Sequence, residues 1–568
     1  MKKSVTIKNM KKSIIIAVLI LPVIFMWGCN SMLNSDMDSI YTENDMLTRA
    51  KFAEGILLTA YSSLPGLTLN DVASDDAVSN QPTGAFRRAA TGEWSSSSDP
   101  FSSWNYYTAI GYLNLFLDEI VDKTVWSTTN AWQDENFRLR LKGEAHGLRA
   151  YYYSELLKSH AGIGATSGEL LGVPMALSSD RSTMPRASFD ECVNQILKDA
   201  QFAIDSLPDL YVGAPTDDPQ QAIKDAVYGP NFKNRMCGRI AKMIKARVLL
   251  QAASPAFNPT DDLSKWAAAA DAAAEIIDAF GGVSALTSAR LEYYLSVSSD
   301  DYLWRKDPTN SSNWETNNFP PSLYGNGNTN PSQNLIDAFP GANGYPISDP
   351  ALSGYVAANP YANRDPRLAK WIIYNGTYFK NATINTIDDA LDGFGKVTGR
   401  STRSGYYMLK FMNPGVSVVT GSVVNQQHAV VLMRYTEAYL IYAEAANHAW
   451  GPDGKGSHAY SARDIIARLR STAGITGSDP YLASLTTKDD FEKLVRNERR
   501  LELCFESSRF WDIRRWKDLA TMKAEIRGTT TGGATSSVVE QRPFADYMIY
   551  GPIPVGEVRK GLEQNQGW

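Results

Sequence analysis

The sequence predicts a mostly α fold: a tetratricopeptide-like scaffold of helical hairpins that carries a large loop-rich subdomain with short strands. Two observations predict it. Apolar residues recur with helical spacing towards both ends of the 568-residue chain, in pairs of segments joined by short turns. Between these ends, residues 281–429 are rich in Asn, Gly, Pro, Ser and Thr and carry few helical stripes. So much irregular chain in a folded protein is usually functional or packed against a scaffold.

The first 28 residues are expected to be a lipoprotein signal peptide and not part of the fold. Five lysines among the first twelve residues precede an apolar run from Ile14 to Trp27, which is shorter than the about 20 residues that span a bilayer. A small residue, Gly28, precedes Cys29, which is typical of a signal cleaved before an acylated cysteine. We therefore expect lipidation at Cys29, which anchors the chain to membrane lipid, and a polar tether over residues 29–45. A plain secretory signal with a chance cysteine is the alternative.

An N-terminal region over residues 46–280 is predicted to contain helical hairpins and a loop excursion at residues 64–104. Ser188 and Glu191 form a capping box, which marks the start of a helix that stops before Pro208. One helix predicted in this region begins at Trp104. Four others cover residues 136–158, 188–207, 238–253 and 264–280, and the last two form a pair.

A C-terminal region over residues 430–568 contains a second helix pair, predicted at residues 430–449 and 458–473. Thr487 and Asp490 cap the helix that follows. Hairpins of this type, of about 34 residues each, stack because each one leaves an apolar face open. A non-repetitive α bundle is the alternative. Small residues stand where paired helices must touch: Gly143, Gly147, Ala246, Ala438, Ala445 and Ala462.

Composition excludes several classes of function. The formal net charge is -5 and no basic run follows the first twelve residues, so we expect no nucleic-acid partner. The chain has four cysteines, without a CxxC motif, and five histidines, without a metal-binding spacing. We therefore expect neither a metal nor a cofactor. The three cysteines beyond Cys29 are an odd number, which favours free buried thiols over a disulfide framework.

A charged segment, residues 496–516, carries glutamates at every fourth position, so we expect them on one face of a helix. A glycosidase also uses paired carboxylates, but across a cleft about 5–10 Å wide and usually on different elements. Neighbouring arginines would depress the pKa of these glutamates and remove the general acid. We therefore predict a structural ion-pair network of Arg496, Glu498, Arg499, Glu502, Glu506, Arg509, Asp512 and Arg515, with a similar bridging part for Arg364, Asp365 and Arg367.

Several segments resemble the SusD/RagB family. Residues 496–516 read RNERRLELCFESSRFWDIRRW and fit the family's pattern R-x-E-R-x-x-E-L-x-x-E-x-x-R-F-x-D-x-x-R-W. Further similar segments are NRDPRL at 363–368, RYTEAYLIYAEA at 434–445, IYGPIPVGEV at 549–558 and the final QNQGW at 564–568. The resemblance covers essentially the whole chain after the signal.

The resemblance implies a fold of four tetratricopeptide-like hairpins with a loop-rich subdomain. It also implies a lipoprotein on the outer face of a Gram-negative outer membrane, which covers a SusC-like TonB-dependent transporter. Members capture oligosaccharides, or in some cases peptides, for import. They have no hydrolytic activity and need no cofactor.

The candidate ligand contacts lie in two loop segments, residues 75–105 and 301–330, because sugars bind to aromatic platforms flanked by amide, carboxylate or Arg groups. Loops on a rigid scaffold usually carry such groups. The best candidates are the aromatic residues Trp314, Tyr324 and Trp94, with Asn318, Asp75 and Arg88 as polar partners. Packing inside the loops is the alternative for each aromatic residue.

The leading hypothesis is a surface glycan-binding lipoprotein that delivers its ligand to a TonB-dependent transporter. Peptide or another nutrient on the same scaffold is the second, and a charged, aromatic-poor pocket would favour it. A glycoside hydrolase and a pure interaction scaffold are further alternatives, which bond cleavage or the absence of a soluble ligand would reveal.

Overall fold

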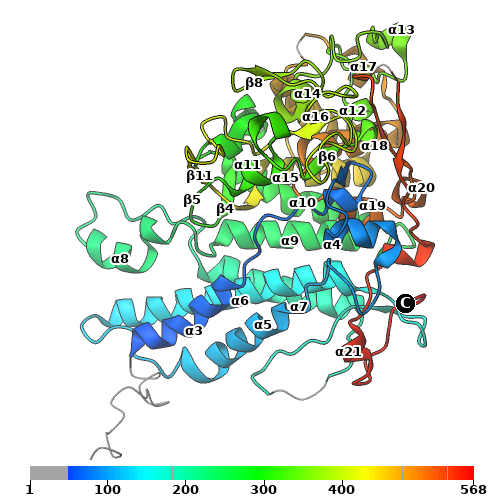
Figure 1. Cartoon of the computed structure of the whole chain (residues 1–568). Coiled ribbons are helices and arrows are strands. Elements are labelled where there is room, and N and C mark those ends of the chain that lie inside the picture. Colours follow the sequence, from blue (N-terminus) through cyan, green and yellow to red (C-terminus); the bar gives the residue numbers. More distant parts are fainter. Residues whose placement is uncertain (1–48, 181–183, 476, 534) are drawn as a thin grey trace, which may run out of the picture.

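The computed structural model describes residues 49–180, 184–475, 477–533 and 535–568. The predicted signal peptide at 1–28, the lipidation site Cys29 and the tether at 29–45 lie outside these residues. Within the described part of the chain, no helix is long and apolar enough to cross a membrane. Figure 1 shows helices stacked in layers, with the loop-rich segment covering one side of the stack.

The N-terminal half of the stack consists of α3 (Ala50–Ser62), α5 (Tyr106–Leu115), α6 (Ala131–His160), α7 (Phe189–Ser206) and α8 (Gln221–Tyr228). The predicted capping box of Ser188 and Glu191 is present at the start of α7. Two glycines let α6 approach its neighbours closely. A Cβ atom on Gly143 would lie 2.8 Å from Leu207, and one on Gly147 would lie 2.5 Å from Met236.

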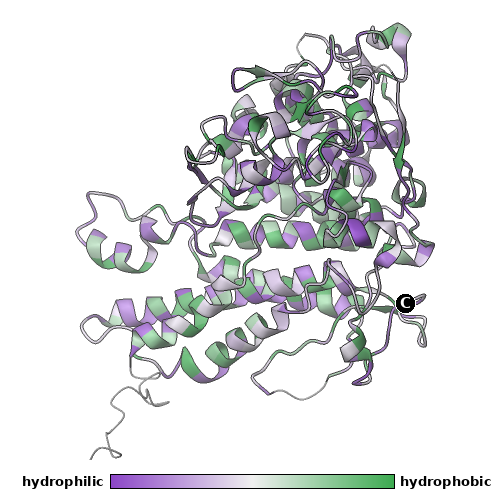
Figure 2. Cartoon of the chain, in the orientation of Figure 1, coloured by the Kyte–Doolittle hydropathy of each residue, from purple (hydrophilic) through white to green (hydrophobic). Residues whose placement is uncertain are grey.

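The second half of the stack consists of α9 (Gly238–Ala253), α10 (Leu263–Phe280), α15 (Tyr435–Trp450), α16 (Ala462–Ala473) and α18 (Lys488–Glu502). Helix α10 packs against both α9 and α15, so it joins the N-terminal helices to the C-terminal ones (Figure 1). Polar and apolar residues alternate along these helices (Figure 2), and the apolar ones form a continuous core. The prediction of a mostly α fold with helix pairs is confirmed.

Some predicted helices begin at other residues than expected, and the one predicted at 136–158 begins earlier, at Ala131. The predicted helix at 430–449 begins only at Tyr435, because Val431–Arg434 form strand β12, which pairs with β4 (Tyr302–Arg305). The predicted helix at 458–473 begins at Ala462, because Ser461 forms a capping box with Asp464. In contrast, the cap predicted at Thr487 is present: its hydroxyl accepts a hydrogen bond from Asp490 N at 3.1 Å.

The loop-rich segment at 281–429 contains short helices and strands. Each of its strands pairs with one other strand in a two-stranded antiparallel sheet, and the partner lies either in the same segment or elsewhere in the chain. One of the segment's short strands is β7 (Ile372–Ile373), which follows directly on helix α14, because Lys370 and Trp371 end that helix. The helices are α11 (Asn313–Asn318), α12 (Gln333–Ala338), α13 (Pro350–Ser353) and α14 (Pro366–Trp371). The remaining strands are β5 (Thr309–Ser311), β6 (Thr329–Pro331), β8 (Tyr378–Phe379), β9 (Ala382–Thr383), β10 (Tyr407–Met408) and β11 (Gln426–His428).

Shorter elements complete the fold. The excursion at 64–104 holds β1 (Ala77–Ser79) and α4 (Ala85–Arg88). Two short strands, β2 (Gly162–Ile163) and β3 (Leu170–Leu171), follow α6. The C-terminal elements are α17 (Pro480–Ser484), α19 (Arg509–Arg515), α20 (Leu519–Met522), β13 (Ile526–Gly528), β14 (Ser537–Glu540) and α21 (Val555–Val558).

The three cysteines among the described residues, Cys192, Cys237 and Cys504, are free and buried, as predicted. Burial raises the pKa of the Cys237 and Cys504 thiols to about 12, so both remain protonated at neutral pH. They pack as small apolar groups.

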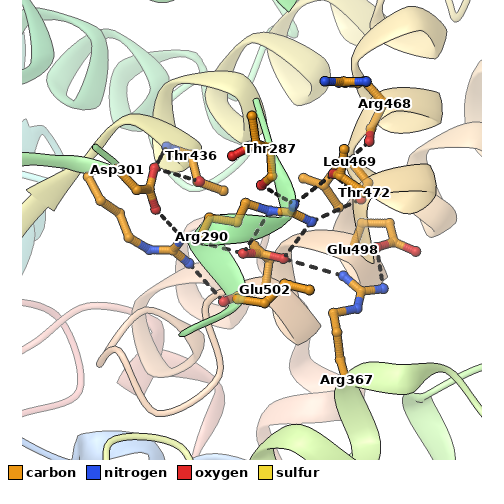
Figure 3. Close-up of polar contacts among 12 residues, drawn as sticks. Thr287, Arg290, Asp301, Arg367, Thr436, Arg468, Leu469, Thr472, Glu498 and Glu502 are labelled. Atoms are coloured by element: carbon orange, nitrogen blue, oxygen red, sulfur yellow. Dashed lines mark hydrogen bonds and ion pairs between the residues drawn. The ribbon is translucent and has the colours of Figure 1, made fainter. Parts of the chain in front are cut away.

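Helix α18 connects the helical stack to the loop-rich segment through the carboxylate of Glu498, which is fully buried (Figure 3). One oxygen accepts a hydrogen bond from Arg367, which belongs to α14, at 2.8 Å. The other accepts from Arg470 on α16 at 2.6 Å. The two guanidinium groups compensate for the removal of the carboxylate from water.

One turn further along α18, Glu502 lies among three arginines (Figure 3). Arg290 approaches it at 3.2 Å and Arg434 at 3.3 Å. Burial alone would raise the pKa of Glu502, but the positive charges outweigh burial and hold its pKa at about 2. A carboxyl group with this pKa is ionised at neutral pH and cannot act as a general acid.

The other residues of the predicted network also make ion pairs, but the cations that face Glu498 and Glu502 come from other segments of the chain. The sequence analysis expected nearby arginines of the same segment instead. Adjacent positions on a helix point in different directions, so Arg499 and Arg500 face away from Glu498. The remaining pairs are Arg496 with Glu492, Arg499 with Asp512, Glu506 with Lys410 and Arg434, Arg509 with Asp75, and Arg515 with Glu444 and Asp512.

Glu506 does not share the helix face of the other two glutamates, because α18 ends at Glu502. The chain then turns through Phe505 and Ser507, which have φ angles of 62° and 61°. The carboxylate of Asp71 accepts hydrogen bonds from the backbone N–H groups of both residues, at 3.2 and 3.1 Å. These bonds hold a backbone conformation that is costly for residues other than glycine.

Candidate functional site: a surface where two loop excursions meet

The two loop segments predicted to bind ligand are joined by an antiparallel pair of strands. Strand β1 of the first excursion pairs with β6 of the loop-rich segment, with Ala77 opposite Pro331 and Ser79 opposite Thr329. The segments that follow β1 and precede β6 therefore emerge side by side. About 250 residues of sequence separate them, and the pairing brings them to one place.

Amide groups connect the chain on either side of this strand pair. Asn80 is buried, and its Nδ2 donates to the carbonyl oxygens of Asn326 and Gly327 at 2.9 and 2.8 Å. The neighbouring Gln81 is half-buried, and its Nε2 donates to Oδ1 of Asn328 at 3.1 Å. These hydrogen bonds hold the two loops in a single arrangement.

A third segment, residues 397–405, completes the arrangement. Gln81 also donates to the carbonyl oxygen of Gly399 at 2.8 Å. Nε and Nη2 of Arg400 both donate to the carbonyl oxygen of Gly325, at 3.0 and 2.8 Å. The backbone N–H of Arg403 donates to Oδ1 of Asn330 at 3.1 Å. The guanidinium of Arg400 therefore lies beside the loop that contains Tyr324.

Tyr324 is the exposed aromatic residue of this region, with 60% of its surface accessible. Its φ angle is 67°, a left-handed conformation that costs about 1–2 kcal/mol for a residue with a Cβ atom. The next residue, Gly325, packs so closely that a Cβ atom there would lie 2.2 Å from the carbonyl oxygen of Phe319. A strained, tightly packed turn thus presents an exposed ring, an arrangement that is typical of functional positions.

We define the junction surface as Gln81, Tyr324, Asn326, Asn328, Arg400 and Arg403. It combines one exposed aromatic ring with half-buried amide and guanidinium groups. Gln81 and Arg400 donate to backbone carbonyl oxygens, and Asn328 accepts from Gln81. An apolar ring face with hydrogen-bonding groups at its edge is suited to a sugar, which has a C–H face and a rim of hydroxyls.

A separate cavity of about 350 Å³ lies between the helical stack and the loop at residues 65–70. Two charge pairs line it: Arg247 with Glu437, and Lys158 with Glu155 at 2.6 Å. The ring of Trp511 lies 5.5 Å from the Lys158 ammonium. The cavity is thus rich in charge pairs, in contrast with the amides of the junction surface.

Comparison with protein families gives two matches that together cover most of the chain. Residues 292–568 match the model of the SusD family, which includes RagB. Residues 43–229 match a related model described as starch-binding associating with outer membrane. The chain belongs to the SusD/RagB family.

Solved structures of SusD-like proteins share the fold of this SusD/RagB member. A SusD-like protein from Bacteroides fragilis NCTC 9343 has a TM-score of 0.70 at 23% identity, over 94% of this chain and 100% of that one. A SusD-like carbohydrate binding protein from the same organism has a TM-score of 0.69 at 19% identity, over 90% and 98%. Surface glycan-binding protein A from Bacteroides fluxus has a TM-score of 0.59 at 19% identity, over 93% and 100%.

Among curated proteins, SusD-like protein P38 of Formosa agariphila is 29% identical over 105 residues. The match covers 18% of this chain and 20% of that relative, so the chain matches about a fifth of the relative's length.

In this SusD/RagB chain, Trp94 is a core residue with 4% of its surface exposed, which corrects the expectation of an exposed platform. Its ring lies 5.0 Å from that of Phe101 and 4.8 Å from that of Trp568, and the Arg514 guanidinium lies 5.1 Å from it. Its indole N–H donates to Asp99 at 2.8 Å. Packed rings cover Trp94, so no sugar can stack on it in this structure.

Asp75 is also buried, which corrects its prediction as a polar ligand contact. It pairs with Arg500 and Arg509, each at 2.8 Å. Burial would raise the pKa of this carboxyl, but the two guanidinium groups outweigh burial and hold it at about 2. Asp75 is therefore part of the structural ion-pair network. It was not among the residues predicted for that network.

Asn318 is 2% exposed, and its Nδ2 donates to the carbonyl oxygen of Trp314 within α11. Burial corrects its prediction as a ligand contact. Trp314 itself is half-buried, with its ring 6.1 Å from that of Phe411. Arg88 is exposed and pairs with Glu93 at 2.6 Å. Of the six candidates, Tyr324 is the one that lies on the junction surface.

The sequence analysis did not select the polar residues of the junction surface, Gln81, Asn328, Arg400 and Arg403. The signal for them is weak: asparagines and glycines fill residues 325–330, and two arginines stand among small polar residues at 398–403. Such composition predicts a loop. Only the pairing of β1 with β6 shows that these loops meet.

Proposed function

We propose that this protein binds a glycan at the junction surface and delivers it to a SusC-like TonB-dependent transporter without cleaving it. Membership of the SusD/RagB family supports the proposal, and so does the similarity to structures named as a carbohydrate binding protein and a surface glycan-binding protein. The single observation that carries the site is the exposed, strained Tyr324 beside the guanidinium of Arg400.

The proposal includes anchoring to the outer membrane by acyl chains on Cys29, with residues 1–28 removed and residues 29–45 as a tether. The family description of association with the outer membrane supports this location. A Cys29→Ser variant is expected to leave the membrane fraction and appear in soluble fractions. Retention of this variant in the outer membrane would contradict lipid anchoring at Cys29.

Binding is tested with the soluble chain that begins at residue 46, on a panel of neutral and acidic polysaccharides in affinity gels. We expect retardation by at least one polysaccharide and at least tenfold weaker binding for Tyr324→Ala, because stacking on an aromatic ring is lost. Tyr112→Ala is the matched control, since Tyr112 is an exposed tyrosine of α5. Equal loss in both variants would contradict the assignment of the junction surface.

Catalysis is tested by the release of reducing ends from any polysaccharide that binds. We expect none, because the glutamates that recur in the segment 496–516 are engaged in ion pairs, and Glu502 has a pKa of about 2. If the purified chain released reducing ends and the Tyr324→Ala substitution left this release unchanged, the protein would be a hydrolase and not a binding protein.

The charged cavity favours a second candidate function, the capture of a peptide. Its Arg247–Glu437 and Lys158–Glu155 pairs offer groups of both signs to peptide termini and charged side chains. Under this alternative, a peptide mixture rather than a polysaccharide binds, and Arg247→Gln weakens binding while Tyr324→Ala has no effect.

A further inference from the structure

Two arginines of the junction surface are held by neutral groups. Nε and Nη2 of Arg400 donate to one backbone carbonyl, that of Gly325. Nη2 of Arg403 donates to the carbonyl oxygen of Val539 at 3.2 Å. Among the described residues neither guanidinium has a carboxylate within 4.0 Å, the limit for an ion pair. Carbonyl groups orient these side chains but leave their positive charges uncompensated.

Arg367 and Arg434, in the buried ion-pair network, have carboxylate partners instead. Arg367 approaches the carboxylates of Asp365, Glu498 and Glu502, and Arg434 those of Asp301, Glu502 and Glu506. There, several carboxylates surround each guanidinium. Arg400 and Arg403 thus lack the carboxylate partners that Arg367 and Arg434 have. The buried Arg364 and Arg514 also donate to backbone carbonyl groups, but Arg400 and Arg403 differ from them because they are only half-buried.

The surroundings of Arg403 carry an excess of positive charge. Glu540 is shared by Arg87, at 2.7 Å, and by Arg542. Burial lowers the pKa of Arg403, the nearby charge of Arg87 lowers it further, and Glu540 offsets only part of this. Nε of Arg403 is buried without a hydrogen-bond partner among the described residues. Two guanidinium groups thus pair with Glu540, and Arg403 adds a third positive charge near them.

One acidic group, Asp392, contacts the turn before Tyr324. Asp392 is 3% exposed and accepts a hydrogen bond from Ser322 N at 2.8 Å. Burial raises the pKa of this carboxyl, which disfavours its ionised form. The guanidinium of Arg400, which donates to the carbonyl oxygen of Gly325, is the positive group that the hydrogen bonds place beside the residue after Tyr324.

We propose, building on the proposed function, that the glycan bound at the junction surface is anionic, with a carboxylate or sulfate group against Arg400 and Arg403 while a sugar ring stacks on Tyr324. Planar guanidinium groups bind carboxylate and sulfate oxygens through paired hydrogen bonds. An anion at this position also relieves the repulsion between Arg87 and Arg403.

The experiment measures binding of the soluble chain to polygalacturonate, alginate, chondroitin sulfate, starch and xyloglucan by affinity gels and calorimetry. Carboxyl-reduced polygalacturonate and alginate and desulfated chondroitin are the matched neutral or less charged ligands. We expect at least one acidic polysaccharide to bind tenfold or more tightly than its reduced or desulfated form. Its affinity should fall as salt is raised, because the attraction is electrostatic. Loss of binding on carboxyl reduction identifies a carboxylate, and loss on desulfation a sulfate.

The variants Arg400→Gln and Arg403→Gln are expected to lower affinity for the acidic ligand at least tenfold and to leave affinity for its neutral form unchanged. Arg403→Lys keeps the charge and is expected to retain part of the preference. Arg468→Gln is the control, because Arg468 also donates to backbone carbonyls, those of Leu286 and Ser284, but on α16. Melting curves of each variant exclude misfolding as the cause.

The outcomes separate this inference from the proposed function. Binding to starch or xyloglucan and to no acidic polysaccharide would retain glycan binding and overturn the anionic ligand. Acidic binding that both arginine variants leave unchanged would overturn it as well. Failure of every polysaccharide to bind would overturn the proposed function and this inference together.

Discussion

Arg367 and Glu498 lie 131 residues apart in the sequence and form an ion pair at 2.8 Å, with neither side chain accessible to solvent. Arg367 belongs to α14 of the loop-rich segment and Glu498 to α18 of the helical stack. The pair therefore connects the part of the chain that presents the junction surface to the scaffold that supports it.

Removal of the Glu498 charge is expected to destabilise the protein strongly. In a Glu498→Gln variant, Arg367 and Arg470 lose a shared carboxylate in the core, and breaking a buried pair costs about 3–5 kcal/mol. The free energy of unfolding from urea denaturation measures this. Lys370→Ala is the control, because the Lys370–Glu292 pair is exposed and should contribute little. Equal effects of the two variants would contradict a stabilising role for the buried pair.

Protonation of Glu502 is expected to lower the stability of the fold in acid. Its pKa is about 2 in the folded protein and 4.5 in its ordinary state, so its contribution is complete above about pH 4.5 and is lost as pH falls towards 2. Denaturation at a series of pH values should show this loss. A Glu502→Gln variant should have lower stability at neutral pH and a shallower decline in this window. A decline as steep as that of the unmodified protein would exclude Glu502 as its source.

Trp94 and Tyr324 are expected to separate stability from binding. Trp94→Ala removes a core ring and should cost about 3–5 kcal/mol. Tyr324→Gly relieves the left-handed conformation, so stability should stay the same or rise by about 1 kcal/mol, while glycan affinity falls. Thermal melts and affinity gels on both variants measure the two properties. A folded Trp94→Ala protein with full stability and no binding would reinstate Trp94 as a ligand contact.

Two glycines of the segment 549–558 should respond differently to alanine. A Cβ atom on Gly551 would lie 2.1 Å from the carbonyl oxygen of Ser159, so Gly551→Ala is expected to cost about 1–3 kcal/mol. Nothing lies within 4 Å of the corresponding position on Gly556, within α21, so Gly556→Ala should be neutral or stabilise by up to about 1 kcal/mol. Urea denaturation compares them, and the reverse order would show that the C-terminal segment does not pack against α6 as described.

Local signals in the sequence predict much of the helical stack. The capping box at Ser188 and the cap at Thr487 appear in the structure, because a side chain and a backbone N–H three residues apart need no distant partner. Helical periodicity likewise predicts α9 and α10 almost to the residue. The start of α15 was misplaced, because Val431–Arg434 take their conformation from a distant strand, β4.

The candidate site was much less predictable. Trp94 and Tyr324 both stand in loop segments rich in polar residues, yet one is buried among aromatic rings and the other is exposed. Both segments are polar, so local composition does not separate the two cases. The difference arises from Phe510, Phe544 and Trp568, distant residues that pack around Trp94.

By itself, the sequence determined the helices, their caps, the family and the presence of a charged network, because these depend on residues close together in the chain. The tertiary structure alone decided which arginines pair with Glu498 and Glu502, which candidate side chains are buried, and that β1 pairs with β6 to form the junction surface. These outcomes depend on contacts between residues tens to hundreds of positions apart, for which short-range spacing carries no signal.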